Sequence, residues 1–153
     1  MASFGLVPHI RLTGMIADLE FAERPAARGL RVAKVSDRET ATDFAAVLSE
    51  AFGFPQDICE AEFVDKALWR EEAYASVSYY HDEPASVSSV IIVDQVLYVG
   101  LVATRPAFRN KGLAMGPTIT CSKRLRPRPA SDGPHYTQRV LGAQSTKNWA
   151  FGL

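Results

Sequence analysis

The feature that most constrains the fold of this 153-residue chain is an apolar run, Val96–Ala103, followed by a proline and a glycine-bearing loop. The run has the length of a strand and is rich in β-branched and aromatic residues, which predicts a central strand buried on both faces. Gly100 interrupts it, and a glycine within a strand marks a bulge or the close approach of a backbone or ligand. Pro106 has no N–H for a ladder, so we expect the strand to end before it.

The segment after this strand predicts an anion site. Apolar spacing resumes at Leu113, where a helix should begin, and the first N–H groups of a helix lack internal partners and carry a partial positive charge. A phosphate can therefore be held largely by backbone at such a point. Gly112 would let the phosphate approach those amides, because it has no Cβ. Arg109 and Lys111 would add charge-assisted donors.

The loop resembles motif A of the GCN5-related N-acetyltransferase (GNAT) superfamily, Arg/Gln-x-x-Gly-x-Gly/Ala. Here the pattern reads Arg109-x-x-Gly112-x-Ala114. The stretch before it, Val102–Pro106, is similar to the Val-Ala-Thr-x-Pro form of many members, in which the strand end pairs with the pantetheine arm like an added strand. The longer match is much more specific than the six-residue pattern alone.

The resemblance implies acetyl-CoA as cosubstrate, no metal, and a loop that binds the pyrophosphate. It also implies that Val102 and Thr104 offer backbone groups to the pantetheine arm. The implied cofactor-binding residues are Val102, Ala103, Thr104, Arg109, Asn110, Lys111, Gly112, Leu113 and Ala114.

Composition narrows the class of protein. The 17 basic and 17 acidic residues balance, so net charge gives no pull toward nucleic acid or a membrane surface. Cys59 and Cys121 match no metal or redox spacing, which favours reduced thiols and a cytoplasmic location. No apolar run approaches membrane-spanning length, and the first residues do not resemble a signal peptide.

The residues before the central strand predict two helices and a meander. Leu30–Val35 alternates like a short strand, and Ser36 with Glu39 forms a capping box for a helix that Gly53 and Pro55 end. A second helix is expected over about Asp57–Arg70. Two strands then follow, Ala73–Tyr80 and Pro84–Val93.

This order of elements is that of the GNAT superfamily, and it predicts an α+β, three-layer fold. The sheet should be mixed, mostly antiparallel and flanked by helices, and incomplete after motif A. We expect an N-terminal extension over residues 1–28, which either packs on the domain or is the remnant of a longer segment. The N-acetyltransferase domain, including motif A, spans residues 29–115, and residues 116–153 form an atypical, poorly ordered tail.

The tail departs from the family because Gly116 and Pro117 break the expected helix and the residues that follow cannot supply apolar faces. One explanation is a frame change near Met115 or Gly116. Joining the third base of each codon to the first two of the next makes Asn148–Trp149 read Leu-Gly. The residues around it then permit Val-Tyr-Lys-Lys-Leu-Gly-Phe-Arg, similar to a late signature of the superfamily.

The resemblance implies acetyl transfer to a primary amine of a small molecule or peptide, and a homodimer is one compatible assembly. The catalytic base and acid stay unassigned. Glu83 and Asp94 are carboxylates in predicted turns, where solvation is the simpler role. The histidines, His81 and His135, are assigned to a turn and the tail, and the acid is not transferred to Tyr136.

Two further questions stay open at the level of sequence. The first two helices flank the acceptor site in the superfamily, so Phe52, Phe54 and Trp69 either line that site or, by the simpler reading, pack in the core. The chain is either an acetyltransferase or a CoA-binding but catalytically impaired remnant. A nucleic-acid binder is disfavoured, because no aromatic residues are interleaved with the basic residues of the tail.

Overall fold

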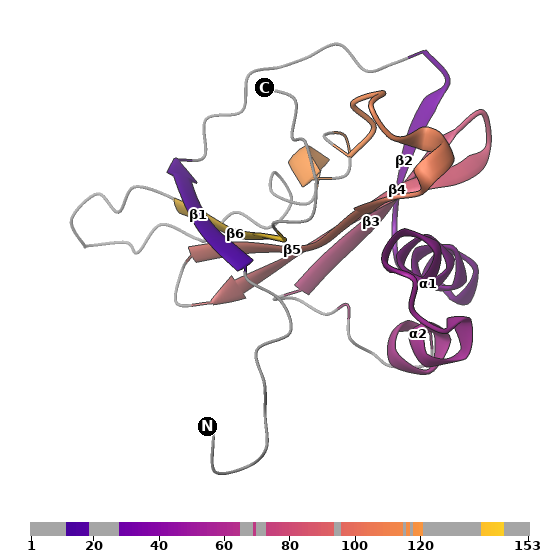
Figure 1. Ribbon diagram of the computed structural model, residues 1–153, viewed down its shortest axis with the longest axis horizontal. Coiled ribbons are helices and arrows are strands. Elements are labelled where there is room, and N and C mark those ends of the chain that lie inside the picture. The colour runs from indigo at the N-terminus through magenta and orange to yellow at the C-terminus, as the bar shows by residue number, and fades with distance from the viewer. Residues whose placement is uncertain are drawn as a thin grey trace.

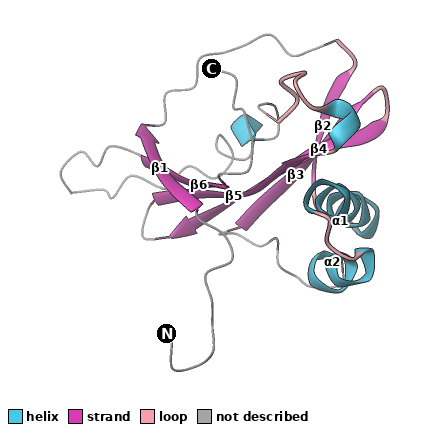
Figure 2. Cartoon of the chain, viewed as in Figure 1, coloured by secondary structure: helices cyan, strands magenta, loops and turns pink. Residues whose placement is uncertain are grey.

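A computed structural model describes residues 12–18, 28–64, 69, 73–93, 96–114, 116, 118–120 and 139–145. These residues form one six-stranded sheet with the order β1-β6-β5-β4-β3-β2, and α1 and α2 lie together beside it (Figures 1 and 2). The elements are β1 (Leu12–Asp18), β2 (Leu30–Lys34), α1 (Arg38–Phe52), α2 (Gln56–Phe63), β3 (Ala73–Tyr80), β4 (Glu83–Val93), β5 (Val96–Thr104), the 3-10 turn η2 (Pro106–Phe108) and β6 (Arg139–Ser145).

The predicted helix α1 forms, but its capping box lies one residue later than expected. Asp37, not Ser36, is the N-cap, and its carboxylate accepts the backbone N–H of Thr40 at 2.8 Å. The Thr40 hydroxyl, and not a glutamate at residue 39, accepts the N–H of Asp37 in return, at 3.4 Å. Aspartate caps as well as serine, and the short threonine side chain reaches the same N–H. Gly53 ends the helix in the left-handed conformation, as predicted.

Helix α2 is shorter than the expected segment and ends at Phe63. Its Cys59 is buried, and Phe63 lies 5.5 Å from the ring of Phe44 on α1. Trp69 completes this aromatic group, with its ring 5.1 Å from that of Phe44. The simpler reading of Trp69 as a core residue is therefore confirmed.

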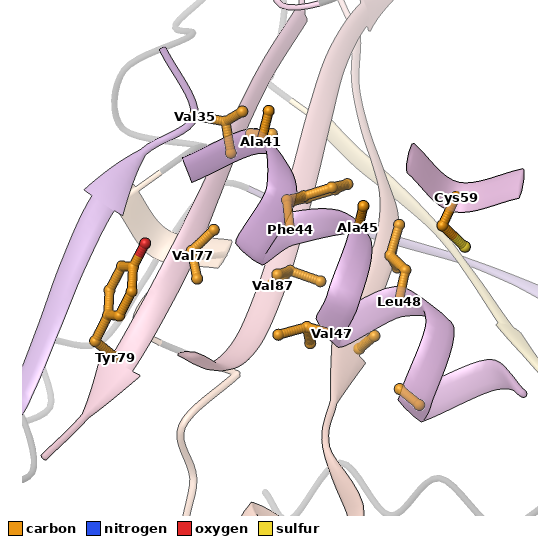
Figure 3. Packing of buried hydrophobic residues seen from close by; sticks show 13 residues of the cluster. Val35, Ala41, Phe44, Ala45, Val47, Leu48, Cys59, Val77, Tyr79 and Val87 are labelled. Carbon is orange, nitrogen blue, oxygen red and sulfur yellow. The ribbon is translucent and has the colours of Figure 1, made fainter. Parts of the chain in front are cut away.

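The core lies between α1 and one face of the sheet (Figure 3). Phe44, Val47 and Leu48 are buried at helical spacing on α1 and face strand residues that include Val77 and Val87. Burial of each such side chain contributes about 1.5–3 kcal/mol, so this face fixes how α1 sits on the sheet.

The opposite face of the sheet is lined at its centre by small polar residues. The cross-strand pairs Ser76–Ser88 and Ser78–Ser86 join β3 and β4, and all four serines are fully buried. The chain after β5 covers them, since the Ser78 hydroxyl donates to the carbonyl of Leu113 at 3.4 Å. Side chains this small let that segment approach the sheet closely, as it does in Figure 1, where it lies across the sheet from α1 and α2.

Strand β5 follows the predicted run, but it is not buried on both faces. Leu97 and Ala103 are buried, whereas Tyr98 and Leu101 are exposed. A bulge near Gly100 accounts for part of this difference, because the pairing with β4 shifts between Ala103 and Gly100 and Leu101 has a φ of 47°. The prediction that Gly100 marks a bulge is confirmed.

The sheet continues beyond β5, which corrects the expectation of a sheet that is incomplete after motif A; the poor order of the rest of the tail stays a prediction. Residues 139–145 form β6, which pairs in parallel with β5. The N-terminal extension contributes β1, which pairs antiparallel with β6 along its whole length. Both pairings join segments far apart in the chain, so no local pattern signals them. The domain boundaries at residues 29 and 115 stay predictions.

Candidate functional site

The site begins where two parallel strands stop pairing. β5 pairs with β6 only over Leu97–Val99, opposite Val140–Gly142. Both strands run on in the same direction, β5 to Thr104 and β6 to Ser145, without further pairing between them. Beyond Val99, the side of β5 that faces away from β4 therefore has no partner strand within the described residues, and we call this unpaired side the opening.

The last residues of β5 present backbone groups to this opening. The Arg105 N–H donates to the carbonyl of Ala85 at 3.0 Å, which makes residue 105 a hydrogen-bonded partner of β4. Backbone direction alternates along an antiparallel strand, so Ala103 also faces β4, whereas Val102 and Thr104 face the opening. Val102 and Thr104 are the residues that the resemblance implies as partners of a strand-like ligand, and that role stays a prediction.

The loop that follows carries a run of unpartnered amides. Within the described part of the chain, the N–H groups of residues 110–114 donate to no protein acceptor. Asn110 and Gly112 have φ values of 62° and 69°, and Lys111 between them has a negative φ. Alternating handedness of this kind turns successive N–H groups toward a common point and makes an anion-binding concavity.

The loop is open at its glycine. A Cβ built on Gly112 would meet nothing within 4 Å, so the protein does not fill that space. The left-handed φ explains why glycine suits the position, and the open space agrees with the predicted approach of a ligand.

Arg109, which the sequence predicts as an additional phosphate donor, is bonded to backbone carbonyls of the protein. Its Nε donates to the carbonyl of Thr104 at 3.2 Å, and one Nη donates to the carbonyl of Ala51 at 3.3 Å. The Thr104 carbonyl is therefore occupied, which leaves its N–H as the group available to a ligand. Sequence reasoning missed Ala51, because nothing local links the end of α1 to a loop 58 residues later.

The other side chains of the loop hold it to the sheet. The ammonium group of Lys111 lies 5.2 Å from the ring centroid of Tyr80 and 5.4 Å from that of Phe108. Leu113 is buried, and its carbonyl accepts the Ser78 hydroxyl. These contacts hold the loop against β3 and η2, and none of them uses the amides of residues 110–114.

A helical turn follows the loop, as predicted. The Thr118 N–H donates to the carbonyl of Ala114 at 3.3 Å, and residues 116 and 118–120 are helical. Gly116 is a place of close packing, since a Cβ there would lie 3.3 Å from side-chain atoms of both Leu30 and Val32. The expectation that Gly116 breaks the helix is therefore wrong at that residue. Met115, Pro117 and residues 121–138, including Cys121, His135 and Tyr136, lie outside the described residues.

Two aromatic residues expected in the core are instead exposed. Phe52 is 38% exposed and Phe54 is 56% exposed, and their rings lie 5.7 Å apart. Phe52 follows Ala51, which Arg109 joins to the end of β5. The two rings therefore lie on the solvent side of the α1 end that contacts the loop.

The groups whose pKa values are raised, Tyr79 and Cys59, contribute to the fold and not to the site. Burial and a 2.6 Å hydrogen bond to Asp43 raise the pKa of Tyr79 above its ordinary value, so its hydroxyl stays a donor. Burial likewise raises the pKa of the Cys59 thiol, which makes it a poor nucleophile. Glu83 is exposed at the start of β4, the ring of His81 packs 4.3 Å from that of Tyr80, and Asp94 lies outside the described residues.

The described residues contain neither a membrane-spanning helix nor a cluster of metal ligands. None of their helices has the length and apolar character needed to cross a membrane. No three or more His, Cys, Asp or Glu side chains in these ranges gather in a way that would hold a metal ion.

Comparisons with known proteins identify the fold. No protein-family profile and no curated protein matches the sequence. Among solved structures, a tandem GNAT protein of the clavulanic acid biosynthesis pathway is similar, with a TM-score of 0.65 and 14% identity, and 97% of this chain is covered. A GCN5-related N-acetyltransferase of Kribbella flavida has a TM-score of 0.58 and 17% identity, with 90% of this chain covered.

These two proteins are about twice as long as the chain, which spans 49% of each. The PaiA N-acetyltransferase of Thermoplasma acidophilum, solved in complex with coenzyme A, has a TM-score of 0.50 and 10% identity, with 63% of this chain and 71% of that protein covered. At these identities the similarity establishes the fold alone.

Proposed function

We propose that this chain, which has the fold of the GCN5-related N-acetyltransferases, binds acetyl-CoA and transfers its acetyl group to a primary amine of a small molecule or peptide. The observation that carries the proposal is the unpaired side of β5, which leads to the amides of residues 110–114, for which the described residues provide no acceptor. CoA is an elongated molecule with a peptide-like pantetheine arm at one end and a diphosphate in its middle. The opening along β5 is complementary to the pantetheine arm, and the loop is complementary to the diphosphate.

In this proposal the pantetheine arm pairs with Val102 and Thr104. The Thr104 N–H and the backbone of Val102 face the opening, and an extended amide-bearing chain can add to a strand through such groups. The pyrophosphate binds the amides of Asn110 to Ala114. The partial positive charge of the helical turn after residue 114 adds to their effect.

The thioester would then lie along β5, near the bulge at Gly100. A bulge points backbone groups away from the regular ladder, and a backbone N–H directed at the thioester carbonyl would stabilise the negative charge that develops on its oxygen. The attacking amine must be neutral, whereas a free alkyl amine has a pKa near about 10.4. A base that accepts this proton is therefore required.

The alternative function is a CoA-binding module without transferase activity. It is favoured by the position of the candidate bases, because Glu83 is exposed at the β3–β4 turn and His81 packs on Tyr80. Neither side chain is held toward β5 by a contact within the described ranges. The presence of β6 favours the transferase, since this strand lies beside β5 on the side of the opening.

Two measurements test the proposal in sequence. Calorimetry with CoA and acetyl-CoA should show binding of one molecule per chain, and absence of binding would refute both functions. A thiol-release assay with acetyl-CoA and a panel of primary amines then separates them. Amine-dependent release of CoA supports the transferase, whereas binding without release by any amine supports the binding module.

A further inference from the structure

We infer that Arg109 is a positioning residue, which ties the amide loop to the last turn of α1 and the end of β5 and is not a ligand of the phosphates. The inference rests on the proposed function, because it assigns a role within the proposed CoA site. It is carried by the two backbone carbonyls to which the guanidinium group donates, those of Thr104 and Ala51.

The end of α1 needs a cation from elsewhere in the chain. The last carbonyls of a helix have no internal partners and carry a partial negative charge, and the last turn of α1 contains no basic residue. Arg109 supplies both a donor and a positive charge to the carbonyl of Ala51, a residue that is only 9% exposed. If Arg109 moved to a phosphate, this poorly solvated carbonyl would lose its partner.

The second hydrogen bond of Arg109, to the carbonyl of Thr104, fixes the distance between the end of β5 and the end of α1. Nε and Nη belong to one rigid, planar group, so the carbonyls of Thr104 and Ala51 are held at a set distance from each other. The free amides begin at the next residue, Asn110. Their position relative to the open side of β5 is therefore set by Arg109.

Arg105 makes a parallel tie on the other side of η2. Its Nε lies 2.5 Å from a carboxylate oxygen of Glu50, and one Nη donates to the carbonyl of Pro84 at 3.2 Å. The two arginines thus flank a three-residue turn and contact consecutive residues of α1, Glu50 and Ala51. The start of the loop is fixed at both sides of η2, and only the residues after it are open to a ligand.

The test compares Arg109→Ala with Lys111→Ala, which removes the same charge from the same loop without freeing a backbone carbonyl. Hydrogen exchange of the ligand-free protein should become faster in Arg109→Ala at the last turn of α1 and at residues 110–114. Lys111→Ala should leave exchange at the last turn of α1 unchanged. A residue that only binds phosphate would not alter exchange in the absence of ligand.

Affinity for CoA provides the second readout. Arg109→Ala should weaken binding by about tenfold, because the amides of the loop would no longer be held in place. Unchanged ligand-free exchange, together with this loss of affinity, would make Arg109 a phosphate ligand and overturn the inference.

A third variant guards against misfolding. Arg109→Lys retains the charge but not the rigid fork, so it should also exchange faster than wild type at the last turn of α1. Wild-type exchange in this variant would overturn the inference as well. Failure of the wild-type protein to bind CoA would refute the proposed function instead, and the exchange experiment on the ligand-free protein would still decide the role of Arg109.

Discussion

At the residue scale, the loop depends on two positions that adopt left-handed conformations for different reasons. Asn110 is a residue type that tolerates a positive φ, and Gly112 is the type that adopts it without strain. Between them they set the direction of the amides, whereas Arg109 sets their position. The motif therefore constrains the backbone conformation of the loop. Its side chains are not needed to direct the amides, and they contact other parts of the protein.

Gly112 provides the sharpest single-residue prediction. Gly112→Asp should weaken CoA binding at least about a hundredfold, because a carboxylate would stand in the open space where the pyrophosphate is proposed to lie. Gly112→Asn is the matched control, since asparagine has the same shape, tolerates a positive φ and carries no charge. Calorimetry on both variants checks this, and equal affinities would contradict a phosphate at this position.

At the element scale, the first helix shows what sequence reasoning can and cannot provide. Five apolar residues recur at helical spacing and indicate one buried face: Phe44, Val47, Leu48, Ala51 and Phe52. All but Phe52 are buried, and Gly53 ends the helix as predicted. The cap was assigned one residue early, because Ser36 and Asp37 are both good N-caps and only the folded chain shows which carries the bond. The link from α1 to Arg109 had no local signal at all.

The capping box of α1 predicts a pH dependence of stability. The backbone N–H and hydroxyl of Thr40 hold the pKa of Asp37 below its ordinary value. A carboxyl whose pKa is lowered by folding stabilises the protein above its unfolded pKa of about 3.9 and loses that contribution as the pH falls through the folded value. Asp37→Ala should therefore lower the melting temperature at neutral pH. The difference from wild type should shrink below about pH 4.

Thermal denaturation followed by circular dichroism across this pH range measures the effect. Asp57→Ala is a suitable control, because Asp57 also lies in the first turn of a helix but is not its N-cap. A deficit in Asp37→Ala that is the same at acid and neutral pH would show that the lost carboxylate bond is not its cause.

At the scale of the whole molecule, the meander was predictable and the closure of the sheet was not. Strands β3, β4 and β5 follow one another with short turns, so their alternation and turn residues were sufficient to predict them. The pairing of Leu12–Asp18 with Arg139–Ser145 joins the two ends of the chain. Such a contact depends on the completed sheet. The unpartnered amides were foreseen from the glycine loop, but the opening that leads to them required β6.

The coding sequence provides a test that needs no protein. If a frame change near Met115 or Gly116 produced the last third of the chain, the shifted frame should be free of stop codons and should spell a Tyr-x-x-Leu-Gly-Phe signature near residue 148. Stop codons in the shifted frame would refute the hypothesis. A chain with the restored frame should then melt more cooperatively than the present one, which calorimetry would measure.

The site as proposed requires β6, and a proline in that strand tests the requirement. β6 is an interior strand, paired with β1 on one side and β5 on the other, so the N–H of Leu141 serves one ladder or the other. Leu141→Pro removes that N–H and should separate the strands, whereas Leu141→Ala keeps it. The proline variant should lose CoA affinity by more than about tenfold relative to the alanine variant, because the second wall of the opening is lost while β5 and its amide loop stay in place. Equal CoA affinity in the two folded variants would mean that the cofactor is held by β5 and the loop alone, and that β6 does not contribute to the site.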